Sequence, residues 1–107
     1  MKIGVIKETQ KGEKRVAISP NISKLLIEKG FELLVEEDAG LASSYKNSDY
    51  ESAGAKIVSR ETLFNESTVL IKINPFDEDD LKLVNNTQIL MSQLYYKSNA
   101  ELLKSIA

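Results

Sequence analysis

Residues 2–37 read KIGVIKETQKGEKRVAISPNISKLLIEKGFELLVEE, and this stretch decides the fold. Two short apolar runs, residues 3–6 and 33–35, have the aliphatic composition that is typical of buried strands. Between them, Ser19 and Pro20 match the N-cap and first residue of a helix, and Gly30 matches the glycine that follows a helix end. Strand, helix and strand in this order predict a βαβ unit, and therefore a parallel sheet.

The rest of the chain continues the alternation of strands and helices. Further strands are expected at residues 56–58, 68–73 and 87–93. Short helices are expected after capping patterns that start at Ser48, Ser59 and Ser98, and another helix is expected to begin with residues 77–80 as its first turn. The acidic run 77–80 suits the positive end of a helix dipole. These elements predict one α/β domain, a Rossmann-like or flavodoxin-like parallel sheet with flanking helices.

Composition excludes several classes of function. With 14 Lys and Arg against 16 Asp and Glu, the formal charge of −2 gives no electrostatic footprint for nucleic acid. The chain has no Cys and no His, which removes thiolate metal sites and the commonest general base, and no metal site is predicted. No apolar run approaches the roughly 20 residues that span a bilayer. The expected location is cytoplasmic, with membrane contact only through another subunit or another part of the chain.

Four polar residues lie where ligands bind in an open α/β sheet, beyond the carboxyl ends of the strands. Arg15 follows the first strand, and its guanidinium can hold a carboxylate or phosphate with two parallel hydrogen bonds. Lys72, Asn74 and Tyr95 lie at or just past later strand ends. Three of the four also have an ordinary structural explanation. Arg15 can be a solvated surface arginine, Lys72 an edge-facing lysine with a partly exposed stem, and Tyr95 a packed aromatic residue.

The usual nucleotide motifs are absent. The five glycines form neither a G-x-G-x-x-G fingerprint nor a G-x-x-x-x-G-K-[ST] phosphate loop. The helical pattern also stops abruptly at Ala107, which suggests a piece of a longer protein. A parallel βα domain without a phosphate loop often holds the substrate side of a two-domain enzyme.

Six segments together form a specific signature: residues 2–8, 13–20, 29–32, 35–40, 53–58 and 69–75. They resemble the N-terminal domain shared by alanine dehydrogenase and the alpha subunit of the proton-translocating pyridine nucleotide transhydrogenase. The resemblance implies that residues 1–107 are the N-terminal part of a two-domain oxidoreductase. The NAD-binding domain with its glycine motif would lie outside this chain. NAD(H) and NADP(H) are the cofactors implied for the complete protein.

The resemblance favours the transhydrogenase branch. Arg15 matches the arginine that binds the substrate carboxylate in alanine dehydrogenase, but that branch's second K-x-K-E-P lysine falls on Asn74 and its histidine falls on or beside Tyr95. In the transhydrogenase branch hydride passes from NADH to NADP on another domain, so no histidine is needed. The domain would form one wall of the NAD(H) cleft, with Arg15, Lys72, Asn74 and Tyr95 facing it and no catalytic residue assigned.

Partners and alternatives follow from the same resemblance. It implies a homodimer and a membrane beta subunit, through which the protein would be membrane-associated. One alternative is an alanine dehydrogenase-like amino-acid dehydrogenase, and another is a non-enzymatic remnant or binding module. A saccharopine dehydrogenase of the lysine-forming type ranks below both dehydrogenase branches. The 107 residues alone are expected to be inactive.

Overall fold

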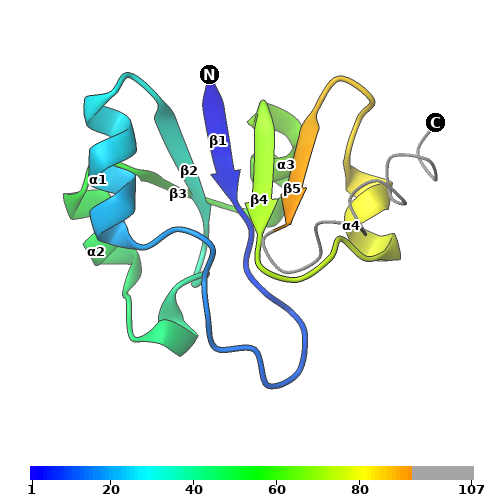
Figure 1. Ribbon diagram of the computed structural model, residues 1–107, viewed down its shortest axis with the longest axis horizontal. Helices are drawn as coiled ribbons and strands as arrows, with labels where there is room; N and C mark the ends of the chain where they lie inside the picture. Colours follow the sequence, from blue (N-terminus) through cyan, green and yellow to red (C-terminus); the bar gives the residue numbers. More distant parts are fainter. Residues whose placement is uncertain (93–107) are drawn as a thin grey trace.

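A five-stranded parallel sheet forms the centre of the computed structural model, which describes residues 1–92. The strand order is β3-β2-β1-β4-β5, and every neighbouring pair is parallel (Figure 1). The strands are β1 (Lys2–Val5), β2 (Glu32–Glu36), β3 (Lys56–Val58), β4 (Val69–Lys72) and β5 (Ile89–Ser92). The five predicted strands are confirmed, and their ends differ from the expected ones by at most two residues.

Helices cover both faces of this sheet. The helices are α1 (Pro20–Glu28), α2 (Asn47–Ser52), α3 (Arg60–Glu66) and α4 (Glu78–Leu83), with a 3₁₀ turn at Leu41–Ser43. One face carries α1 on β2 and α2 on β3, and the other carries α3 on β1 and β2 beside α4 (Figure 1). Strand alternation explains the two faces, because successive side chains point to opposite sides. Val5 therefore joins the cluster under α1 and α2, and Ile6 joins the cluster under α3 and α4.

The predicted caps of α1 and α3 are confirmed. The hydroxyl of Ser19 accepts the backbone N–H of Ile22 at 3.3 Å, and the hydroxyl of Ser59 accepts that of Thr62 at 3.3 Å. Gly30 has φ +100°, the left-handed conformation that favours glycine after a helix. The hydrogen bonds of Ser19 and Ser59 each satisfy one backbone N–H that has no partner within its own helix.

The predicted start of α2 at Ser48 is wrong. The helix begins at Asn47, and the carboxylate of Asp49 accepts the backbone N–H of Lys46 at 2.7 Å. Asn47 also pairs with Asp38 through two hydrogen bonds, one to its backbone and one to its side chain. These long-range bonds fix where the chain turns into the helix, so Ser48 already lies inside it.

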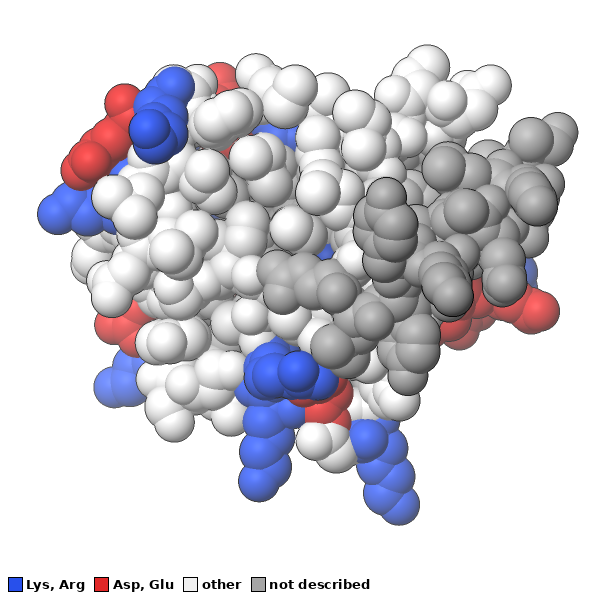
Figure 2. Space-filling view, viewed as in Figure 1, with Lys and Arg blue, Asp and Glu red and all other residues white. Residues whose placement is uncertain are grey.

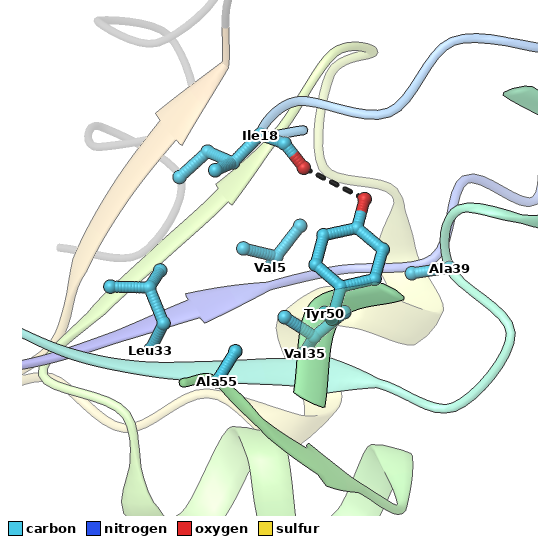
Figure 3. Close-up of a cluster of buried hydrophobic side chains, with 7 residues drawn as sticks. All are labelled: Val5, Ile18, Leu33, Val35, Ala39, Tyr50 and Ala55. Atoms are coloured by element: carbon cyan, nitrogen blue, oxygen red, sulfur yellow. Dashed lines mark hydrogen bonds between the residues drawn. The ribbon is translucent and has the colours of Figure 1, made fainter. Parts of the chain in front are cut away.

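Tyr50 fastens the long loop after β1, residues 6–19, to α2. Its ring is fully buried, and its hydroxyl donates to the carbonyl oxygen of Ile18 at 2.8 Å (Figure 3). Burial raises the pKa of Tyr50 to about 12, with smaller contributions from Tyr45 and Asp49. The hydroxyl therefore stays protonated and keeps donating, which fixes the end of the loop that carries Arg15.

The strand order creates a topological switch point between β1 and β4. The chain leaves β1 for α1 on one face, and it leaves β4 for α4 on the other. At such a point the two connections diverge and leave a crevice beyond the carboxyl ends of the strands, where ligands of open α/β sheets bind. In Figure 1 the loop after β1 extends below the sheet at this edge. Among residues 1–92, no helix is long and apolar enough to cross a membrane.

Candidate functional site

Two hollows lie at the switch point. The larger has a volume of about 520 Å³ and is lined by residues 10–15 together with Asn74. The smaller, of about 180 Å³, shares Glu13 and Arg15 with it and also includes Lys7 and Glu8. We call the two together the switch-point cleft. Figure 2 shows Lys and Arg side chains projecting from the lower edge of the molecule, where Figure 1 places the loop after β1.

Glu8 ties the loop after β1 to the end of β4. One of its carboxylate oxygens, Oε2, accepts the backbone N–H of Ile73 at 2.8 Å. The other, Oε1, accepts both the backbone N–H and the side-chain Nδ2 of Asn74, each at 3.1 Å. A carboxylate that receives several hydrogen bonds is held in one geometry, so Glu8 sets the distance between the two loops of the cleft.

Asn74 lies at the base of the cleft and is only 6% exposed. Its Nδ2 donates to Glu8 Oε1 at 3.1 Å and to Glu13 Oε1 at 2.9 Å. Both partners are carboxylates, which accept hydrogen bonds and donate none when ionised. The amide therefore bridges two negatively charged side chains that come from the same loop.

Arg15 is held by Glu13 along one edge of its guanidinium. Arg15 Nε donates to Glu13 Oε2 at 3.0 Å and Nη2 donates to Oε1 at 2.9 Å, and the backbone N–H of Arg15 adds a third bond at 2.9 Å. Hydrogen bonds from the side chain and backbone of Arg15, and then from Asn74, lower the pKa of Glu13 to about 2. The Arg15 side chain is 59% exposed, and its Nη1 makes no hydrogen bond to any residue in 1–92.

This geometry leaves Arg15 able to bind an anion. A guanidinium has five N–H donors, and the pair with Glu13 uses two of them on one edge. The outer edge, formed by Nη1 and the remaining Nη2 hydrogen, can engage a carboxylate or phosphate with two parallel bonds. Glu13 positions the guanidinium without occupying that edge.

Lys72 lies elsewhere, on the side of the sheet covered by α3 and α4. Its side chain is 3% exposed, and Nζ donates to Asp80 Oδ2 at 2.9 Å, where Asp80 is 1% exposed. The explanation of Lys72 as an edge-facing lysine with a partly exposed stem is therefore wrong. Strand alternation did predict its side chain on the face opposite Ile71, but the structure does not bring it to the lining of the switch-point cleft.

Lys72 belongs to a cluster of four charged side chains, which we call the buried ion cluster: Glu36, Arg60, Lys72 and Asp80. Arg60 bridges Glu36, at 3.2 Å, and Asp80. Burial raises the pKa of Asp80, but bonds from Lys72, the Asp77 backbone and Arg60 outweigh burial, so its pKa lies below the usual value. The acidic run 77–80 was predicted only as a complement to the helix dipole. The sequence indicated that a lysine in an apolar strand is costly to bury unless it is paired, but it did not identify Asp80 as the partner.

Two further predictions concern Tyr95 and metal binding. Tyr95 lies outside the described residues. Within residues 1–92 no three His, Cys, Asp or Glu side chains are placed to hold a metal ion together. The described part of the cleft thus offers Arg15 and Asn74 as its central polar groups, braced by Glu8 and Glu13.

Sequence comparison finds one matching family model and several curated relatives. Residues 4–107 match the model described as alanine dehydrogenase/PNT, N-terminal domain. An alanine dehydrogenase of Staphylococcus haemolyticus is 36% identical over 106 residues, which are 99% of this chain and 28% of that protein. Alanine dehydrogenase 1 of Staphylococcus aureus strain COL is 33% identical over the same length and share. The chain thus spans under a third of the length of these relatives.

Solved structures show the same fold. The match to the transhydrogenase from Sinorhizobium meliloti covers 99% of this chain and 32% of the transhydrogenase chain, with a TM-score of 0.87. At 24% sequence identity this is a likeness of fold alone. An L-alanine dehydrogenase matches 99% of this chain and 30% of its own with a TM-score of 0.85 at 27% identity. The predicted Rossmann-like α/β fold is confirmed.

Proposed function

The chain belongs to the alanine dehydrogenase/PNT N-terminal domain family, and from this premise we propose that its switch-point cleft forms one wall of an NAD(H) site in an oxidoreductase. The glycine-motif domain that forms the other wall lies outside residues 1–107. Arg15 binds an anionic group of the ligand and Asn74 binds near its reacting end. Lys72 contributes by holding α4 against β4. Tyr95, which lies outside residues 1–92, is proposed as a further ligand contact.

The outer edge of the Arg15 guanidinium is the observation that carries this proposal. It is positioned by Glu13 and lies at the switch point, where this class of sheet binds ligands. A cation held on one edge and open on the other is already oriented for binding, so a ligand does not bear the cost of ordering it.

Asn74 favours hydride transfer of the transhydrogenase type. An amide, not an ammonium, stands between Glu8 and Glu13, and the nearby Lys72 is committed to Asp80. Within residues 1–92, no cation therefore occupies the position between Glu8 and Glu13, where it could bind the carbonyl oxygen of a 2-oxo acid. In this proposal hydride passes from NADH to NADP(H) on another domain. The complete protein is a homodimer joined to a membrane beta subunit that translocates protons.

An alanine dehydrogenase-type reaction is the second candidate. The curated relatives at 36% and 33% identity are alanine dehydrogenases, and one of the two solved structures is also an L-alanine dehydrogenase. In this reaction Arg15 binds the carboxylate of an amino acid or 2-oxo acid whose other contacts differ from the usual lysine and histidine. A binding module without turnover is the third possibility.

Kinetic assays of the full-length natural protein separate these candidates. NADH oxidation that requires pyruvate and ammonia supports the dehydrogenase. Hydride exchange between NADH and an NADP analogue, without pyruvate, supports the transhydrogenase. If NADH binds but neither reaction is observed, the protein is a binding module. NADH that does not bind at all contradicts the proposed function.

The role of Arg15 has its own test. Arg15→Gln removes the anion-binding edge, and we expect NADH affinity to fall about ten-fold or more, the effect of a hydrogen bond to a charged group. Lys24→Gln, an exposed charge deletion on α1, is the matched control and should leave affinity unchanged. Equal affinity for both variants would exclude Arg15 from the site.

A further inference from the structure

The side-chain amide of Asn74 uses its nitrogen, Nδ2, in hydrogen bonds within the protein, whereas its oxygen, Oδ1, has no partner within residues 1–92. Both Nδ2 hydrogens point to carboxylates, those of Glu8 and Glu13. Its carbonyl oxygen, Oδ1, makes no hydrogen bond to any residue within 1–92, and solvent reaches it, because the one fully buried side-chain atom without a partner in these residues is the Ser67 oxygen. Asn74 as a whole is 6% exposed and lines the cleft. An acceptor without a protein partner in the wall of a cleft can bind an N–H donor of a ligand or a water molecule.

The orientation of this amide is fixed by its neighbours. Glu13 accepts two hydrogen bonds on each carboxylate oxygen, from Arg15 and Asn74, and Glu8 accepts three in total. Turning the amide over would place Oδ1 against both carboxylates and break both Nδ2 bonds. The unpaired acceptor of this cleft-lining residue is therefore held in one orientation in the free protein, before any ligand binds.

We infer that Asn74 is a fixed hydrogen-bond acceptor that selects ligands with an N–H donor at the base of the cleft. In NAD(H) the matching donor is the carboxamide NH₂ of the nicotinamide ring. This inference rests on the proposed function. A ligand with only an acceptor at this point leaves two oxygen atoms facing each other with no hydrogen between them, which costs affinity. Residue 74 thus determines whether the cleft offers the ligand an acceptor or a donor.

The experiment compares NADH with reduced 3-acetylpyridine adenine dinucleotide, in which a methyl group replaces the carboxamide NH₂. Both ligands are titrated by calorimetry into the full-length natural protein and its variants. The native protein should bind NADH about five-fold more tightly than the analogue, the effect of one neutral hydrogen bond. Asn74→Leu, similar in size, should bring that ratio close to one, and so should Asn74→Lys.

The two variants keep the test decisive. Asn74→Leu leaves Glu8 and Glu13 without their shared donor, which can lower the affinity for both ligands equally. Such a general loss does not change the ratio of the affinities for NADH and the analogue. Lysine supplies donors to both carboxylates, so the local structure is retained while the acceptor is lost. Asn65→Leu, on the exposed surface of α3, is the control and should keep the native ratio.

The failure of this inference differs from the failure of the proposed function. If NADH binds and the ratio is the same in the native protein and both Asn74 variants, the acceptor role is wrong while the NAD(H) site stands. If the native protein shows no preference for NADH, the acceptor role is wrong as well. If NADH does not bind the native protein, both are wrong.

Discussion

Replacing Asp80 by asparagine removes one negative charge from the buried ion cluster with little change in side-chain volume. Lys72 is 3% exposed and would lose its carboxylate partner, keeping within residues 1–92 a neutral amide oxygen at position 80 and the ring of Phe76, 5.7 Å from Nζ. Leaving a buried charge without its partner costs about 3–5 kcal/mol. Because a domain of this size is stabilised by about 5–15 kcal/mol in total, Asp80→Asn should leave the protein folded but with much of its stability lost.

Removing the positive partner of this pair should lower the free energy of unfolding less than Asp80→Asn does. Lys72→Met keeps most of the apolar stem and removes the ammonium, while Asp80 retains Arg60 and the backbone N–H of Asp77 as partners in the native state. Arg60 is 29% exposed, so it can draw on water as well. We expect Lys72→Met to cost about 1–3 kcal/mol, below the full penalty for an unpaired buried charge. The double variant should cost less than the sum of both, because each change removes the charge that the other leaves unpaired.

Urea-induced unfolding followed by circular dichroism measures these differences. The matched control is Lys82→Met on α4, whose pair with Asp79 spans 3.9 Å between side chains that are 75% and 88% exposed. That change should stay within about 0.5 kcal/mol. An Asp80→Asn variant within about 1 kcal/mol of the native protein would refute the reasoning. A Lys72→Met variant less stable than Asp80→Asn would also refute it.

Three further outcomes follow from single contacts. Tyr50→Phe removes the hydroxyl that binds the Ile18 carbonyl and should lower the free energy of unfolding by about 1 kcal/mol, measured by urea titration. Ser67→Ala removes the one buried side-chain oxygen in residues 1–92 that lacks a hydrogen bond, so stability should stay equal or rise in the same assay. Glu13 should titrate near pH 2 by carboxyl NMR. Its hydrogen bonds to Arg15 should be intact above pH 4.5 and lost as pH falls through about 2, whereas Arg15→Gln should return the titration toward 4.5.

The sheet and most helices were predictable because local signals and the global fold agree. Apolar runs, the Ser19 and Ser59 caps and Gly30 act within one turn or one strand, and the structure keeps all of them. The meeting of Arg15 and Asn74 at one edge was also predictable. Parallel strands place all their carboxyl ends on the same side, so loops that are distant in sequence come together there.

The buried ion cluster was only half predictable, for a physical reason. Strand alternation places Lys72 opposite Ile71, but it does not say whether that face is covered by a helix. The cover is supplied by α3 and α4, whose packing depends on long-range contacts. Asp80 could serve either as a solvated helix-capping residue or as a counter-ion. The position of α4 against β4 determines the outcome: Asp80 caps the helix with Asp77 and is also the counter-ion of Lys72.

Asn74 illustrates what a single sequence position conveys without its neighbours. By family pattern it is a missing lysine, which speaks against one reaction and names no other. In the structure two carboxylates that could neutralise a lysine at this position, those of Glu8 and Glu13, hold the amide nitrogen. They therefore leave the carbonyl oxygen as the unpaired polar atom of this side chain within residues 1–92, so the position can offer a ligand an acceptor and no free donor. The substitution changes which ligand group can bind there, and the surrounding carboxylates, not Asn74 alone, determine that change.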